Sequence, residues 1–459
     1  MTSTSFRSEG ERIEQVLRSP AQPTVIYDAE QVDARGRRGQ AWVIATGGVI
    51  HSVGQGRSRL DSALRGLGLP PVPVAAASAG AESGESAGAN ADASACACGG
   101  NPTPGAPVTQ QRDGCAFINA SGRLLTPGFI DIHSHGAWQS SFDDGAEAIR
   151  TARAGHMVHG TTRQVLSLIT NPLDVMCANL AEVRQAMSVR SDILGAHLEG
   201  PFIALARKGA HDPACLRDPE PAAVDQLLQA ADGCIRQVTI APERAHGMEA
   251  IGRLAGARVV PAVGHCDADY ARTQQAFDAG ARVLTHIFNA MNGIHHREPG
   301  PIPAALEDSR VTAELINDGF HVQDPVVRLA FHLFPHRIAL ITDAMEATGC
   351  PDGAYKLGSL DVEVRDGHAR LVSNGAIAGS TLTLDVAVRR AVQAIGLSAP
   401  EAVEAATLTP ARALGLDRPN TITGAPLGLL APAYAADLLL LDPLTYTPQT
   451  IIAAGHRVL

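Results

Sequence analysis

The sequence lacks three features that would each assign it to a broad class of protein. No apolar run reaches the roughly 20 residues that a membrane-spanning helix needs, and no run of basic residues offers a face for nucleic acid. The formal net charge of −10 also argues against a nucleic-acid partner. Residues 1–14 are polar and charged, unlike a signal peptide. We therefore expect a cytoplasmic protein that binds neither membrane nor nucleic acid.

The 8 cysteines lack the paired spacing of a metal site or a disulfide framework. Cys96 and Cys98 form one isolated C-x-C pair, and the other cysteines are scattered along the chain. We interpret all of them as reduced thiols, which agrees with a cytoplasmic protein.

Large apolar residues are nearly absent from residues 75–107, which are rich in alanine, serine, glycine and proline. Such a stretch cannot bury enough surface to offset the entropy lost on ordering it. The composition predicts a mobile surface insertion whose deletion leaves activity intact.

Both ends of the chain show the pattern of a small β-domain. Residues 24–54 alternate apolar and polar side chains between turn residues, and an apolar strand-like run returns at 436–442. We therefore predict a discontinuous β-sandwich domain formed by residues 1–126 and 421–459, with a catalytic domain at 127–420 between them.

Short β-rich runs alternate with amphipathic helical segments from residue 127 onward. The predicted strands are 129–135, 160–168, 192–199, 237–243, 258–265, 282–287, 312–318 and 337–343. A further helical region at 382–416 follows the last of them. Successive strand–helix units of this kind predict an α/β fold, a closed (β/α)8 barrel of the TIM type.

Histidines and carboxylates recur where these predicted strands end. The first strand ends in His133 and His135, whose spacing would place both imidazoles on one face. The later strands supply the other members of the set, which are Glu199, His265, His286, His321 and Asp343. The carboxyl ends of barrel strands share one rim, so we expect these side chains to meet there. Imidazoles that converge with a carboxylate are typical ligands of zinc.

This set of side chains predicts metal-assisted hydrolysis of an amide-like bond. A bound metal lowers the pKa of water from about 15.7 towards 7. Asp343 ends the last strand and could take up a proton and return it to a leaving group. His321 lies just beyond the seventh strand and could donate a hydrogen bond to a developing oxyanion.

Local sequence strings around these positions resemble one known family. They are PGFIDIHSHG (127–136), GAHLEGPF (195–202), KGAHDP (208–213), APE (241–243), VGHCDAD (263–269), LTHIFNAMNGIHHREPG (284–300), INDGFHV (316–322), LITDAM (340–345) and AGSTLT (378–383). Their order and spacing resemble the amidohydrolase superfamily and, within it, the N-acetylglucosamine-6-phosphate deacetylase family. The resemblance covers residues 127–416.

The resemblance implies a divalent metal, with zinc expected and iron(II) as the alternative, at one or two ions per chain. Glu199, His265 and His286 would hold the principal ion, and a glutamate at this point of the third strand is characteristic of the family. Members that lack the His-x-His pair use one metal. This chain has the pair, so His133 and His135 would hold a second ion.

The resemblance also implies hydrolysis of N-acetylglucosamine 6-phosphate to glucosamine 6-phosphate and acetate, a step in amino-sugar catabolism. Asp343 would be the general base and acid, and His321 would polarise the acetyl carbonyl. Arg297 would bind the phosphate from the neighbouring subunit of a homodimer. The other expected substrate contacts are Ala210, His211, Asn289, Ala290, Ile377, Ala378 and Gly379.

Two other functions remain open at this level. Dihydroorotases and D-aminoacylases share the superfamily fold, but they typically bridge two metals with a lysine or a cysteine. Here Glu199 occupies the bridging position, and no lysine ends a predicted strand. A non-catalytic sugar-phosphate sensor on this scaffold could dispense with Asp343 and the histidines, yet the chain retains them all. A deacetylase is therefore our main prediction.

Overall fold

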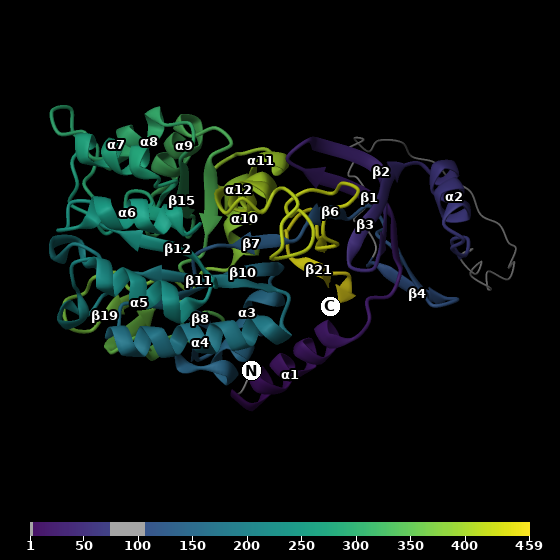
Figure 1. Ribbon diagram of the computed structural model, residues 1–459. Helices are drawn as coiled ribbons and strands as arrows, with labels where there is room; N and C mark the ends of the chain where they lie inside the picture. Colours follow the sequence, from purple (N-terminus) through teal and green to yellow (C-terminus); the bar gives the residue numbers. More distant parts are fainter. Residues whose placement is uncertain (1–2, 74–105) are drawn as a thin grey trace, which may run out of the picture.

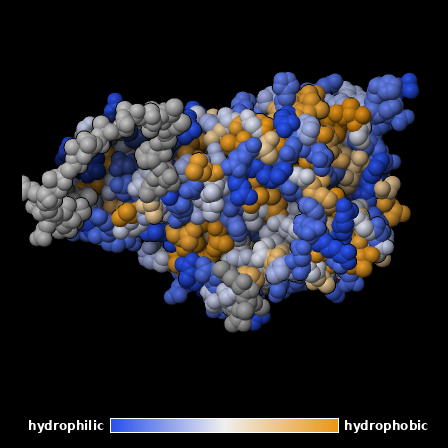
Figure 2. Space-filling view, turned by 180° about the vertical axis from the view of Figure 1, so that it is seen from behind, coloured by the Kyte–Doolittle hydropathy of each residue, from blue (hydrophilic) through white to orange (hydrophobic). Residues whose placement is uncertain are grey.

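The computed structural model describes residues 3–73 and 106–459, where a parallel barrel adjoins a smaller β-domain. In Figure 1 the barrel lies on the left of the view and the β-domain on the right. Of the insertion predicted at 75–107, all but the last two positions lie outside the described residues. Figure 2 shows the reverse face, where hydrophobic residues form small groups separated by hydrophilic ones.

The barrel sheet has eight parallel strands that neighbour one another in chain order. They are β7 (Phe129–Asp131), β10 (Thr161–Ile169), β11 (Ile193–Glu199), β12 (Ile235–Ile240), β13 (Val260–Val263), β14 (Val283–Leu284), β15 (Thr312–Ile316) and β16 (Ile338–Ile341). Contacts just beyond β7 and β16 join the first strand to the last. Asp343 N donates to His133 O at 2.9 Å, and Thr342 Oγ1 donates to Asp131 Oδ2 at 2.6 Å. The predicted barrel is confirmed.

Helices follow the barrel strands and lie outside the sheet (Figure 1). They are α3 (Ala146–Met157), α4 (Leu173–Val189), α5 (Pro221–Ala231), α6 (Gly247–Gly256), α7 (Tyr270–Ala279), α8 (Pro301–Glu307) and α9 (Asp324–Leu333). The helical region predicted after the last strand is present as α10 (Leu384–Gln393), α11 (Ala399–Ala405) and α12 (Leu408–Ala413). No helix within residues 3–73 and 106–459 is long and apolar enough to cross a membrane.

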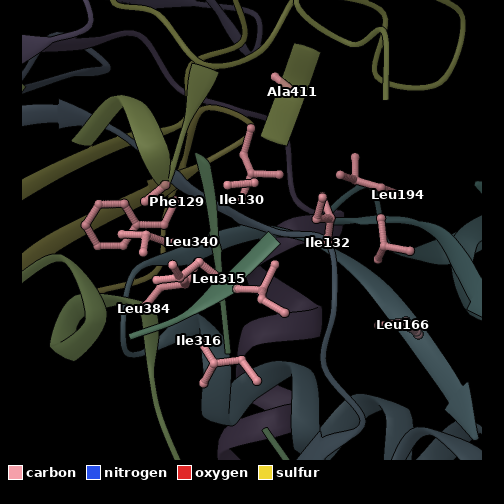
Figure 3. Close-up of a cluster of buried hydrophobic side chains, with 14 of the residues drawn as sticks. Phe129, Ile130, Ile132, Leu166, Leu194, Leu315, Ile316, Leu340, Leu384 and Ala411 are labelled. Carbon is pink, nitrogen blue, oxygen red and sulfur yellow. The ribbon is translucent and has the colours of Figure 1, made fainter. Parts of the chain in front are cut away.

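Apolar side chains from strands far apart in the sequence pack together in the barrel. Figure 3 shows residues of β7, β15 and β16 beside residues of α10 and α12. Phe129, Leu315 and Leu340 have exposed fractions of 0%. The largest core cluster extends from these strands to the surrounding helices, so the barrel is filled by side chains and forms a rigid support for its rim.

The β-domain is built from both ends of the chain, as predicted. Its nine-stranded sheet contains β1 (Thr24–Asp33), β2 (Gly36–Thr46), β3 (Val49–Gln55), β4 (Val108–Arg112), β5 (Cys115–Asn119), β6 (Leu124–Pro127), β20 (Leu438–Leu441), β21 (Pro448–Ala453) and β22 (His456–Arg457). The C-terminal strands join the N-terminal ones where β20 pairs antiparallel with β6. A buried ion pair between Arg163 Nε and Asp437 Oδ2, 2.7 Å apart, ties this domain to the barrel.

Several elements differ from the prediction. Helices α1 (Ser3–Arg18) and α2 (Arg57–Gly66) were not predicted, and neither was a three-stranded sheet of β17 (Gly353–Leu357), β18 (Leu360–Arg365) and β19 (His368–Leu371). Strand β7 ends at Asp131, four residues before the predicted end. His133 and His135 therefore lie in the loop that follows β7, which continues into the short strands β8 (Gly136–Ala137) and β9 (Ser140–Ser141).

Candidate active site

A pocket of about 340 Å³ opens at the carboxyl ends of the barrel strands. Most residues predicted for the site line it: His135, Glu199, Ala210, His211, His265, His286, Asn289, Ala290, His321, Asp343, Ile377 and Gly379. The barrel topology brings these residues together because consecutive parallel strands end at the same rim.

Glu199 lies at the centre of the site. It is the last residue of β11, and its carboxylate is buried among five imidazoles. The Nε2 atoms of three of them lie 3.2 Å from Oε1, namely those of His133, His265 and His286. The Nε2 atoms of the other two lie near Oε2, that of His135 at 3.1 Å and that of His211 at 3.4 Å.

The donor atoms fit a divalent cation. His265 Nδ1 donates to Arg207 O at 2.8 Å, so its Nε2 keeps a lone pair for the site. That nitrogen lies 3.0 Å from His286 Nε2, and both face the same oxygen of Glu199. Lone pairs and a carboxylate that converge in this way repel one another unless a cation lies between them.

Two overlapping groups have ligand atoms within 4.8 Å of one another. They are His133, His135, Glu199 and Asp343 in one case, and Glu199, His211 and His265 in the other. His211 was predicted as a substrate contact, and the structure also places it beside this carboxylate. Its Nδ1 lies 2.8 Å from Thr170 Oγ1, which itself donates to Glu199 O, so Nδ1 donates and Nε2 faces Glu199 with a lone pair.

The site carries concentrated negative charge. Burial opposes ionisation of Glu199, but the imidazoles of His133 and His135 beside its carboxylate hold the pKa of the carboxyl well below its usual value. Burial likewise opposes ionisation of Asp343, but the hydrogen bond from His135 and the nearby His133 together outweigh it, so the pKa of Asp343 is lowered. Burial disfavours the charged form of His135, but bonds to Asp343 and Glu199 raise its pKa to about 9. The carboxylates therefore attract a cation strongly.

Three of these residues have strained backbones. His265, His286 and Asp343 have positive φ angles of 45°, 26° and 50°. Such conformations cost about 1–3 kcal/mol each and persist where the surrounding structure enforces them, which is common at functional sites. Gly379 packs against this rim, because a Cβ atom at its φ of +62° would lie 2.9 Å from Asp343 O.

His321 faces the pocket from the segment after β15 and is held by Asp318. Its Nδ1 lies 2.7 Å from Asp318 Oδ2, and Asp318 Oδ1 accepts the backbone N–H groups of Phe320 and His321 at 2.8 Å. Since the carboxylate can only accept, His321 donates through Nδ1. The pair therefore has a fixed orientation in which Nε2 is free to contact a ligand.

Three predicted residues do not line this pocket. His133 is fully buried behind it, and Ala378 packs in a hydrophobic cluster with residues of β17–β19. Arg297 is exposed and lines a separate hollow of about 700 Å³ together with Asp267 and Tyr270. Within one chain, Arg297 is therefore not part of the pocket.

The comparisons with known proteins agree with this geometry. Residues 124–457 match the model of the amidohydrolase family. The chain is 39% identical over 323 residues to N-acetylgalactosamine-6-phosphate deacetylase of Escherichia coli O157:H7, covering 70% of this chain and 84% of that protein. It is 34% identical over 346 residues to N-acetylglucosamine-6-phosphate deacetylase of Lysinibacillus sphaericus, covering 74% of this chain and 87% of that protein.

The chain belongs to the amidohydrolase family. The fold of this amidohydrolase also matches the structure of a mutant N-acetyl-D-glucosamine-6-phosphate deacetylase from Mycobacterium smegmatis in complex with N-acetyl-D-glucosamine-6-phosphate. The TM-score is 0.77 at 35% identity, with 95% of this chain and 100% of the other covered. The predicted resemblance to these deacetylases is confirmed, and membership of the family implies a divalent metal.

Sequence reasoning did not identify three residues that line the active site of this amidohydrolase or contact its histidines. Arg207 lines the pocket, and its side chain is held by Asp267 and Asn292. Asp318 orients His321, and Glu314 contacts His133. Glu314 could have been noticed as the one charged residue in the apolar strand Thr312–Ile316, and Asp318 by its spacing three residues before His321.

Proposed function

We propose that this amidohydrolase hydrolyses N-acetylglucosamine 6-phosphate to glucosamine 6-phosphate and acetate, as part of amino-sugar catabolism. The observation that carries the proposal is the convergence of Asp343, His321 and the histidines around Glu199 on one pocket. Relatives named for deacetylation of N-acetylated amino-sugar phosphates, at 34–39% identity, support the substrate class.

Zinc is the metal we propose, with iron(II) as the alternative. Glu199, His265 and His286 would hold the principal ion, and His133 and His135 a second one, because their nitrogens face the same carboxylate. When bound, the metal would lower the pKa of the attacking water and polarise the amide carbonyl. Imidazole nitrogens with a carboxylate suit zinc well.

Asp343 would transfer the proton. It is ionised before reaction, since its pKa is lowered by the hydrogen bond from His135 despite burial. It can therefore accept a proton from the attacking water and deliver it to the nitrogen of the leaving amino sugar. The strained backbone of Asp343 would fix the direction of that transfer.

His321 would donate a hydrogen bond to the carbonyl oxygen of the acetyl group. Its contact with Asp318 holds the ring through Nδ1, so Nε2 is the nitrogen that would donate to the carbonyl oxygen. Asn289, Ala290 and the segment Ile377–Gly379 would position the sugar along the pocket wall.

The 6-phosphate would be bound by Arg297 of a second copy in a homodimer. This explains why an exposed arginine that follows the pocket residues Asn289 and Ala290 has its side chain outside the pocket of its own chain. Arg207, which lines the pocket, is a second cation available to the phosphate.

The six cysteines of the described residues are all free thiols, which supports a cytoplasmic location.

N-acetylgalactosamine 6-phosphate is a second candidate substrate. It differs from the glucosamine compound at one hydroxyl, and the relative at 39% identity is named for it. The residue roles proposed above concern the acetyl and phosphate groups, so they favour neither sugar over the other.

Acetate release from a panel of N-acetyl amino sugars tests the proposal. The metal-loaded protein should be given N-acetylglucosamine and N-acetylgalactosamine, each with and without the 6-phosphate. We expect the phosphorylated glucosamine compound to have the highest kcat/KM. A higher kcat/KM for the galactosamine phosphate would make that compound the substrate in place of the glucosamine phosphate. A preference for unphosphorylated sugars would contradict the phosphate assignment.

A further inference from the structure

Glu314 is a carboxylate that the proposed reaction does not use. It is the third residue of β15, it is fully buried, and it does not line the pocket. A buried carboxylate is costly unless hydrogen bonds and a positive charge compensate it. In the described part of the chain, the one basic side chain within ion-pair distance of Glu314 is His133.

Both oxygens of Glu314 have partners from other segments of the barrel. Oε1 accepts from Gln237 Nε2 at 2.7 Å, and Oε2 accepts from His286 N at 3.3 Å. Oε2 also lies 3.0 Å from His133 Nδ1. An ionised carboxylate can only accept, so His133 carries a proton on Nδ1, and Nε2 is the nitrogen left to bind a cation.

His133 Nε2 points at two other carboxylates. It lies 3.2 Å from Glu199 Oε1 and 3.6 Å from Asp343 Oδ1, with hydrogen-bond geometry to neither. Nε2 and two carboxylates are brought together here, and a cation bound between them satisfies all three.

The other candidate ligands lack such support. Nδ1 of His135 and of His286 has no hydrogen-bond partner among the described residues, and His265 Nδ1 donates to the neutral Arg207 O. Among His133, His135, His265 and His286, His133 is thus the one whose Nδ1 contacts a carboxylate. Carboxylates in that position fix the tautomer and raise the basicity of a ligand imidazole.

We propose that Glu314 is a positioning residue that fixes the tautomer of His133 and thereby builds the second metal site of this protein. The inference rests on the proposed function in one respect, the principal ion at Glu199, His265 and His286. It adds that the chain binds two ions, and that the second depends on a carboxylate outside the pocket.

The affinities for the first and second Zn²⁺ test this proposal. They are measured by titrating zinc into the full-length Glu314→Gln protein after its metal has been removed with a chelator. The substitution removes the charge but keeps the shape, and Gln237 can accommodate the new amide by turning its own unpartnered Oε1 towards it. We expect the affinity for the second Zn²⁺ to fall about 10–100-fold and the affinity for the first to stay as in the wild type. Glu404→Gln is the matched control, because Glu404 is a buried carboxylate 2.8 Å from His336 Nδ1 and away from the pocket.

The wild-type protein gives a second readout that needs no variant. Two-bond ¹H–¹⁵N NMR of the zinc-loaded protein should show His133 protonated on Nδ1. A proton on Nε2, a single zinc ion at saturation, or an unchanged second affinity in Glu314→Gln would each overturn the proposal. Failure of the proposed function is distinguishable, because it would appear as absence of acetate release by a wild-type protein that binds both ions.

Discussion

Asp343 is the residue whose substitution separates proton transfer from metal binding. Asp343→Asn should retain the principal ion, because the proposed ligands of that ion, Glu199, His265 and His286, do not include Asp343. Its kcat should fall by about 10²–10⁴, the usual contribution of general acid–base transfer. Elemental analysis and steady-state kinetics measure the two quantities, with the exposed Asp361→Asn as control. Near-normal turnover in the metal-loaded variant would mean that another group moves the proton.

Arg297 tests the phosphate contact across a dimer. A charge-assisted hydrogen bond contributes about 1.5–3 kcal/mol, so Arg297→Ala should lower kcat/KM for the 6-phosphate at least about tenfold, mainly through KM. His211→Ala should raise KM more mildly. Turnover of an unphosphorylated N-acetyl sugar should barely change. Equal loss with both substrates would make Arg297 structural, and a larger KM effect in Arg207→Ala would transfer the phosphate role to the chain's own pocket.

Among the elements, α3 holds the loop that carries the His-x-His pair. His156 of this helix is fully buried and bonds to Gly136 O through Nε2 at 3.0 Å, while Nδ1 has no hydrogen-bond partner in the described residues. Burial, together with nearby Arg153, lowers the pKa of His156 to about 3. The imidazole therefore stays neutral in the folded protein at pH values where the unfolded chain already binds a proton.

This difference predicts a pH dependence of stability. Below the unfolded pKa of about 6.5, the His156 imidazole binds a proton in the unfolded chain but not in the folded protein. The free energy of unfolding therefore falls as the pH falls towards 3. From pH 6.5 to 5, His156 should cost the wild type about 2 kcal/mol of unfolding free energy. His156→Gln keeps a donor for Gly136 O. Between pH 6.5 and 5, its free energy of unfolding, measured with denaturant at each pH, should fall by about 2 kcal/mol less than that of the wild type. An equal fall in both proteins would show that His156 is protonated when folded.

At the scale of the whole molecule, the barrel and its rim could be predicted from sequence because strand ends in a parallel barrel converge whatever the helices between them do. The sequence could not show that Glu314 meets His133, since these residues are 181 positions apart and only the closed sheet brings them together. The β17–β19 sheet was missed because its buried face packs against residues from distant parts of the chain, among them Ile169, Ala210 and Met345. Arg297, which we propose to serve the pocket of a second copy, poses the same difficulty between chains.

Removal of the metal should abolish activity without unfolding this amidohydrolase. The hydrophobic core fills the barrel independently of the rim, so circular dichroism of chelator-treated protein should keep its native helical signal. The melting temperature should rise when zinc is restored, because a ligand that binds the folded state stabilises it. A chelated protein that lost its secondary structure would show the metal to be structural.

The most direct test of the account is acetate release from N-acetylglucosamine 6-phosphate while zinc is added back to chelator-stripped protein. Wild-type protein should regain activity as the principal ion binds. Glu199→Ala should neither hold that ion nor recover, because its carboxylate faces all the candidate ligand histidines. Full metal content or a wild-type rate in Glu199→Ala, or no acetate from the loaded wild type, would contradict the assignment of this rim as a metal-dependent deacetylase site.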